Sequence, residues 1–287
     1  MVKRWMMLLS ALLLLTACEK LDLTGFVAPA SDDANRRVKE SLAMTHKGGP
    51  ANIDVASDDY VVYVCTDAHT GKSHQRLSEF VRRQRADALA AFGLQLGDIS
   101  NELGAMKVAA GILAYDSDRD NYDTPIYGIV GNHDLFFGQW EDFKQYFGSS
   151  TYTFTVTTPN YRDLYVMLDS GGGCHGKRQM EWLRGVLANR NLYRHCVVCS
   201  HVNIFSTDNS QDLSGNLPLE ETYELMDLLA SKHVDLYLQG HDHHRKETIY
   251  GGVHFITLDC LRDDVDYVSY MTFEVGDGIG WTIHDNI

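Results

Sequence analysis

The stretch V-D-L-Y-L-Q-G-H-D-H-H, residues 234–244, joins an apolar run to three histidines within four residues. The run at 234–239 is typical of a buried strand, and the glycine that follows permits a sharp turn. Side chains two residues apart in an extended segment point the same way, so His241 and His243 are predicted to face one cleft, whereas Asp242 and His244 point elsewhere. Two imidazoles at one strand end indicate a metal site only if other strands end similarly.

Four other predicted strands do end in polar residues of this kind. Residues 61–66 lead into Asp67 and His69, residues 93–96 into Asp98, residues 126–130 into Asn132, His133 and Asp134, and residues 195–199 into His201. Ligands of open α/β sheets bind at the carboxyl ends of the strands. A carboxylate such as that of Asp98 has two oxygens and can bridge two cations. The five strand ends together therefore predict a metal centre.

The order of elements predicts an α/β domain with a largely buried sheet. Further strands are expected at 152–157, 164–168, 253–258 and 268–275, and helices around 77–81, at 180–187 and at 225–229. A short helix is expected within 33–46. The last forty residues contain strands alone, which are predicted to be antiparallel and to form a second sheet.

The first eighteen residues, MVKRWMMLLSALLLLTAC, have the features of a targeting segment. A basic start precedes an apolar stretch at 5–15 that is too short to span a bilayer. The ending L-T-A-C resembles a bacterial lipobox, which predicts cleavage before Cys18 and attachment of lipid to its thiol. The alternatives are an ordinary cleaved signal or an uncleaved anchor. We expect a signal peptide at 1–17, a tether with an N-terminal helix at 18–58 and a domain at 59–287, exported and lipid-anchored to the bacterial cell envelope.

Composition excludes some classes of function. The formal charge is −14, so no basic surface for nucleic acid is expected. Cys196 and Cys199 form a C-x-x-C, but they lie within a predicted strand, where a thiolate is not stabilised as it is at a helix N-terminus. The H-x-H-x-D-H spacing of metallo-β-lactamases is absent, which excludes that class of hydrolase.

The ordered set D-x-H, G-D-x-x-N, G-N-H-D, a later single histidine and G-H-x-H resembles the calcineurin-like metallophosphoesterase superfamily over about residues 60–260. The resemblance implies a four-layer αββα sandwich with two mixed β-sheets and a site for two divalent metal ions, either Mn, Fe or Zn. It implies that Asp67, His69, Asp98 and His243 hold one ion and that Asp98, Asn132, His201 and His241 hold the other. His133 would protonate the leaving group, and Asp134 would orient His133.

The implied activity is hydrolysis of phosphate esters, in which a hydroxide between the metals attacks phosphorus. Phosphodiesters of nucleotide-like or phospholipid-derived type are the expected substrates. The alternatives are a phosphomonoesterase or a non-catalytic surface scaffold with the same fold. Asn101 is a candidate substrate-binding residue, and it stands where purple acid phosphatases have a tyrosine, which argues against an iron–tyrosinate centre. The polar stretch at 203–216 is expected to form a lid that selects the substrate.

Overall fold

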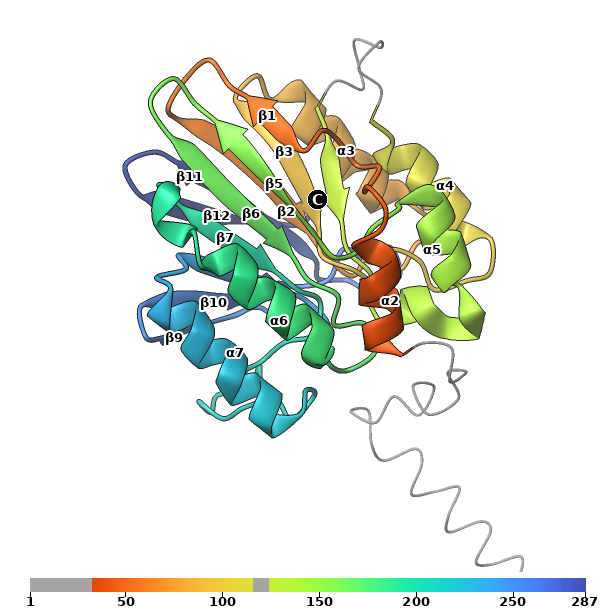
Figure 1. Cartoon of the computed structure of the whole chain (residues 1–287). Coiled ribbons are helices and arrows are strands. Elements are labelled where there is room, and N and C mark those ends of the chain that lie inside the picture. The colour runs from red at the N-terminus through yellow and green to blue at the C-terminus, as the bar shows by residue number, and fades with distance from the viewer. Residues whose placement is uncertain (1–32, 116–123) are drawn as a thin grey trace, which may run out of the picture.

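The computed structural model describes residues 33–115 and 124–287 (Figure 1). The predicted signal peptide, Cys18 and the first part of the predicted tether lie outside these residues. Within them, no helix is both long and apolar enough to cross a bilayer.

Six α-helices and twelve strands make up the described chain. The helices are α2 (Ala34–Ser41), α3 (Gln75–Ala86), α4 (Ala105–Leu113), α5 (Trp140–Tyr146), α6 (Gly176–Leu187) and α7 (Leu219–Ser231), with short 3₁₀ helices at His133–Gly138 and Arg190–Leu192. The strands are β1 (Asn52–Asp54), β2 (Tyr60–Cys65), β3 (Ala90–Gln95), β4 (Ile126–Gly128), β5 (Tyr152–Thr157), β6 (Arg162–Met167), β7 (Cys196–Cys199), β8 (Leu236–Gln239), β9 (Lys246–Tyr250), β10 (Val253–Thr257), β11 (Ser269–Val275) and β12 (Ile279–Asp285).

The strands form two mixed sheets packed face to face. One sheet has seven strands in the order β1-β5-β6-β7-β8-β10-β9, and the other has five in the order β12-β11-β2-β3-β4. Between them lies an apolar core to which both sheets contribute, with Val62, Phe92 and Leu94 from one sheet and Phe154, Met167 and Leu238 from the other.

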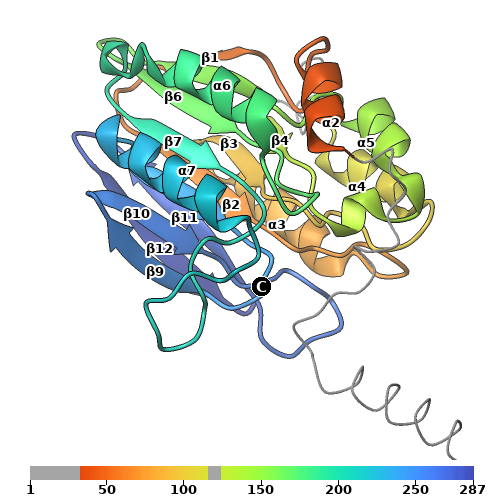
Figure 2. The ribbon, with the colours of Figure 1, turned by 60° about the horizontal axis from the view of Figure 1, so that its bottom comes forward.

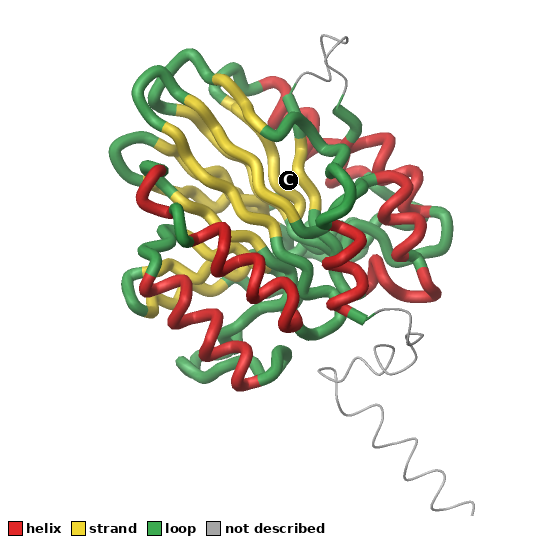
Figure 3. Tube along the Cα trace, in the orientation of Figure 1, coloured by secondary structure: helices red, strands yellow, loops and turns green. Residues whose placement is uncertain are grey.

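Helices cover the outer face of each sheet. Figure 2 shows α6 and α7 side by side over β6 and β7, and their apolar faces bury Leu183, Leu187 and Leu225 against that sheet. Helices α3, α4 and α5 cover the five-stranded sheet. The strands thus form a double layer between two helical layers, as the colours of Figure 3 make plain. The predicted αββα sandwich with two mixed sheets is confirmed.

The prediction for the C-terminal strands needs correction. They do not form a sheet of their own: β10 pairs in parallel with β8, and β11 pairs antiparallel with β2, so each sheet receives two of them. Tertiary pairing decides this, because a run of strands carries no signal for its partners. The predictions also lacked the edge strands β1, β9 and β12 and the short helices α4 and α5.

The N-terminal segment packs on the domain from residue 33 onward. Asp33 caps α2 by accepting a hydrogen bond from the amide of Asn35, and Arg37 is fully buried in an ion pair of 2.8 Å with Asp169. Strand β1 adds to the edge of the seven-stranded sheet by pairing with β5. The predicted helix is therefore present, although it ends at Ser41 rather than near residue 46.

Candidate metal centre

The carboxyl ends of strands from both sheets meet at one edge of the sandwich. Three nitrogen and oxygen atoms converge there from Asp67, His69 and His243. The two Nε2 atoms of His69 and His243 lie 3.1 Å apart, and Nε2 of His243 lies 3.2 Å from Oδ1 of Asp67. Two ring nitrogens directed at one point in this way are typical of a shared cation.

A second group converges beside the first one. The side-chain oxygen of Asn132 lies 3.0 Å from Nε2 of His201 and 2.9 Å from Nδ1 of His241. The other ring nitrogen of His201, Nδ1, donates to the carbonyl of Leu96 at 2.8 Å. That hydrogen bond fixes the ring and directs Nε2 into the site, because a metal-binding histidine is commonly oriented by a carbonyl that accepts from its other ring nitrogen.

Asp98 lies between the two groups. Its Oδ2 is 3.6 Å from Nε2 of His69, and its Oδ1 is 3.4 Å from Nε2 of His201. Each oxygen therefore faces one group, which is the arrangement that a bridging carboxylate needs. The combinations of described residues able to hold an ion are Asp67 with His69 and His243, His69 with Asp98 and His133, and Asp67 with Asp98 and His201.

The backbone of this centre is strained. Asp67, His69, Asp98, His241 and His243 all have φ between 43° and 76°. Non-glycine residues seldom adopt this left-handed region, and such strain concentrates at functional sites. His241 and His243 do face the same site, as predicted, but they do so in left-handed turns rather than in an extended segment.

Glycines allow the strand ends to approach one another. A Cβ on Gly131 would lie 2.2 Å from Oδ1 of Asp98, and one on Gly240 would lie 2.4 Å from Oδ2 of Asp67. No side chain fits at either position. Close approach, and not only the predicted sharp turn, is what these two glycines provide.

Electrostatics hold the two carboxylates in their charged form. Burial alone would raise the pKa of Asp67 and Asp98, but the facing imidazoles, His201 above all, hold both pKa values below the usual range. For His201, burial would lower the pKa, yet the two carboxylates raise it to about 10. Among the described residues no Lys or Arg forms an ion pair with Asp67 or Asp98.

The donor set fits divalent cations. Buried carboxylates are normally paired or bound to a metal. Oδ2 of Asp67 accepts hydrogen bonds from the hydroxyl of Thr66 and the amide of His241, whereas its Oδ1 is buried and makes no hydrogen bond. An ionised oxygen in this position, directed at two imidazoles, is suited to coordinate a cation.

His133 and Asp134 begin the 3₁₀ helix next to the centre. The side chain of His133 is 30% exposed, and its Nε2 lies 3.9 Å from Oδ2 of Asp98. The buried carboxylate of Asp134 accepts hydrogen bonds from the amides of Ile99, Ser100 and Gly131, so it ties two site loops together. Burial and, after it, the charge of Asp98 raise the pKa of Asp134 to about 7. That Asp134 orients His133 stays a prediction.

A cavity of about 440 Å³ opens onto the centre. The described residues that line it are Asp98, Asn132, His133, Ser206, Thr207, Ser214, Asn216, His241, Asp242, His243, His244 and Arg262. Sequence reasoning placed the 203–216 stretch here but missed Arg262, because no motif marks the loop after β10. Asp242 and His244 were predicted to point away from this cleft, but both line the cavity beside His241 and His243, because the turn after β8 is not extended. The exposed Asn101 is not among the lining residues.

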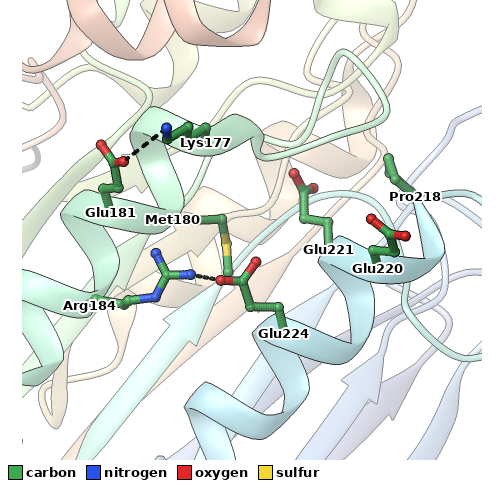
Figure 4. A pocket seen from close by; sticks show the side chains of 8 residues that line it. All are labelled: Lys177, Met180, Glu181, Arg184, Pro218, Glu220, Glu221 and Glu224. Carbon is green, nitrogen blue, oxygen red and sulfur yellow. Dashed lines mark ion pairs between the residues drawn. The ribbon is translucent and has the colours of Figure 1, made fainter.

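A second hollow of similar size lies between α6 and α7, away from the strand ends (Figure 4). Its charged side chains are largely paired with one another: Arg184 forms an ion pair with Glu224, and Lys177 lies 3.8 Å from Glu181. Glu221 is also engaged, because it accepts hydrogen bonds from the amides of His175 and Gly176. Ion pairs and hydrogen bonds therefore engage most of the charged groups around this hollow.

The sequence matches the family model described as calcineurin-like phosphoesterase over residues 60–245. Among curated proteins no sequence matches. Among solved structures, GAP50, titled the anchor in the inner membrane complex of Plasmodium, aligns with a TM-score of 0.58 at 14% identity, over 78% of this chain and 84% of that one.

Two further structures align over about half of their own length. Purple acid phosphatase PPD1 from yellow lupin (Lupinus luteus) seeds gives a TM-score of 0.55 at 12% identity, over 81% of this chain and 52% of its own. A putative 5'-nucleotidase from Staphylococcus aureus gives a TM-score of 0.51 at 14% identity, over 79% of this chain and 53% of its own. At these identities the likeness concerns the fold alone.

Proposed function

The chain belongs to the calcineurin-like phosphoesterase family and is therefore a phosphoester hydrolase; from this premise we propose that it cleaves phosphodiesters with two divalent cations. The observation that carries the proposal is the pair of convergent donor groups joined by the two oxygens of Asp98. One cation would be held by Asp67, His69, Asp98 and His243, and the other by Asp98, Asn132, His201 and His241. Mn, Fe and Zn all suit this mixture of imidazole, amide and carboxylate donors.

A bound pair of divalent cations neutralises the phosphoryl oxygens and supplies a nucleophilic water at neutral pH. The chain's own part in the reaction is orientation and proton transfer. His133 faces the cavity beside Asp98, which is a suitable position for protonating the leaving oxygen. Asp134, by tying the loop of Asp98 to that of Gly131, keeps His133 close to Asp98. A substrate contact from Asn101 would require its exposed side chain to reach the cavity from outside.

Two other functions compete with this proposal. A phosphomonoesterase would use the same groups, and the site geometry does not separate the two ester classes. A non-catalytic scaffold is the competitor from another class. All seven predicted ligand positions carry side chains that can bind a metal ion, and His133 can donate a proton. This complete set favours an enzyme over a scaffold.

We further propose that the protein is exported and anchored in the bacterial cell envelope by a lipid on Cys18. The support is the L-T-A-C ending of the apolar leader. Growth with labelled palmitate should label the wild-type chain and leave Cys18→Ala unlabelled. Equal labelling of both would exclude the anchor.

The function is tested by hydrolysis of bis-p-nitrophenyl phosphate and p-nitrophenyl phosphate by the full chain with Mn²⁺, Zn²⁺ or Fe²⁺. Metal content is measured on the same samples. Turnover that requires metal and disappears in Asp98→Ala and His133→Ala supports the enzyme, and the ratio of the two rates gives the ester class. Bound metal without turnover of either ester would favour the scaffold.

A further inference from the structure

We propose that the cavity beside the metal centre selects esters whose leaving group is a neutral, hydroxyl-rich sugar or polyol rather than a nucleoside. The inference rests on the proposed function, because it concerns the substrate of that same site. The residues that line the cavity restrict the kind of leaving group, and several of these residues lie outside the family motifs.

The first observation is that every described lining residue carries a polar side chain. Among the twelve described lining residues there is no aliphatic side chain and no Phe, Tyr or Trp. Phe136 packs its ring 4.4 Å from that of His133 but does not line the cavity. A nucleobase gains much of its binding energy by stacking on aromatic rings, about 1–3 kcal/mol per base. Among the described lining residues the rings available for stacking are the imidazoles of the histidines alone.

The second observation is that the 203–216 wall is anchored. Lys246 donates from its ammonium group to the carbonyls of Ser206 at 2.7 Å and Asp208 at 2.8 Å, and also to that of Ser210. Beneath this loop the side chains of Ile204, Phe205 and Leu217 are buried in the core under α7. A wall held in this way presents fixed polar groups to a ligand; that the segment also acts as a lid stays a prediction.

The third observation is the kind of polar group that this wall presents. The hydroxyl of Thr207 donates to Oδ2 of Asp242 at 2.9 Å, and that of Ser214 donates to the carbonyl of Asn203 at 2.6 Å. Because a hydroxyl has one proton and two lone pairs, both side chains keep acceptor capacity after these bonds are made. Together with the carboxylate of Asp242 they form a wall of acceptors, which matches the donor protons of ligand hydroxyls.

The fourth observation concerns charge. Arg262 is the one Lys or Arg among the described lining residues, and Asp264 binds its guanidinium through two bonds of 2.8 and 2.6 Å. Asp242 adds a negative charge to the wall. Outside the metal centre, therefore, the described lining has no unpaired Lys or Arg that could bind a second phosphate. This favours a neutral leaving group over a polyphosphorylated one.

The test compares substrates that share a phosphoryl group and differ in the leaving group. The monoester pair is glycerol 3-phosphate and adenosine 5'-monophosphate, and the diester pair is glycerophosphoglycerol and adenylyl-adenosine. The full wild-type chain with Mn²⁺ should favour the polyol member of the hydrolysed pair by about tenfold or more in kcat/KM. Thr207→Val should reduce that preference about three- to tenfold, mainly through KM, as the loss of one hydrogen bond predicts. Thr207→Ser should restore it.

Thr282→Val, the same chemical change on exposed β12, is the matched control and should keep the wild-type preference. Equal or better turnover of the adenosine esters would overturn the inference, and so would an unchanged preference in Thr207→Val. Hydrolysis of p-nitrophenyl esters with no turnover of either polyol ester would overturn it too, while the proposed function stands. If no ester of any kind is hydrolysed, the proposed function itself fails.

Discussion

Two buried clusters of aspartate and histidine lie at opposite ends of the strands, and they differ in how their charges are balanced. At the amino ends, Asp163 is paired with Arg194 at 2.6 Å and Asp235 with Arg190 at 2.7 Å. His195 reaches Asp235 with one ring nitrogen and donates to the carbonyl of Gly276 with the other. We call these five side chains the amino-end cluster. Each of its charges has a partner in the chain.

The metal centre at the carboxyl ends uses the same residue types without arginines. Asp67 and Asp98 face imidazoles, backbone amides and the hydroxyl of Thr66 instead of guanidinium groups, and one buried oxygen of Asp67 makes no hydrogen bond. Five residues of the centre also have left-handed backbone, whereas none of the amino-end cluster does. The comparison teaches that buried Asp and His form a candidate site when imidazoles alone balance the carboxylates and the backbone beneath them is strained.

The largest expected effect is that of Asp98→Asn, which keeps the shape and removes the charge shared by both groups. We expect kcat/KM to fall by about 10³-fold, comparable to the loss of a group that stabilises charge in the transition state. In EDTA the variant should also unfold at a lower temperature than the wild type, because the facing imidazoles lower the pKa of Asp98 and its charge therefore stabilises the fold. Hydrolysis assays measure the loss of activity, and thermal unfolding measures the loss of stability. An unchanged unfolding temperature in EDTA would show that the imidazoles do not balance this charge in the metal-free fold.

Asp163→Asn should have the opposite character. It leaves Arg194 without its charged partner and replaces one of two acceptor oxygens with an NH₂ group: Oδ2 accepts from the hydroxyl of Tyr60, and Oδ1 accepts from the amide of His195. Breaking a buried pair in this way costs about 3–5 kcal/mol of unfolding free energy. Denaturant unfolding measures the loss, and activity per folded molecule should stay near the wild-type value. A loss below about 1 kcal/mol would mean that the pair contributes little.

Metal should stabilise one cluster alone. At a free metal concentration of 100 times Kd, binding to the folded state adds about 2.7 kcal/mol to the unfolding free energy. Mn²⁺ should therefore raise the melting temperatures of the wild type and of Asp163→Asn, with similar gains in unfolding free energy, and EDTA should reverse the rise. The gain in unfolding free energy should be smaller in Asp98→Asn. Equal increments in all three proteins would place the stabilising ion elsewhere.

The features of the fold that the sequence predicts are those that depend on local pattern rather than on contacts between distant segments. Strand ends with their Asp and His residues follow from local pattern, so the fold class and the residues that the centre brings together were predictable. The pairing of β11 with β2 was not, because pairing is decided by contacts between distant segments. Arg262, in the loop after β10, was missed since no pattern marks it. The left-handed turns at Asp67 and His241 were missed because a period-two argument assumes extended backbone.

The smallest expected effect is a pH dependence confined to the amino-end cluster. Burial would lower the pKa of His195, but the carboxylate of Asp235 and the carbonyl of Gly276 outweigh it and raise the pKa above its usual value. A histidine with a raised pKa in the folded state binds its proton more tightly there than in the unfolded chain. Its contribution to stability is thus complete below the unfolded value of about 6.5 and is lost as pH rises through the folded value. In EDTA, which removes metal-linked protons from the comparison, the wild type should lose more unfolding free energy than His195→Gln between pH 6 and pH 9. Parallel pH curves for the two proteins would mean that this imidazole is neutral in the fold, and that the arginines alone balance the carboxylates of the amino-end cluster.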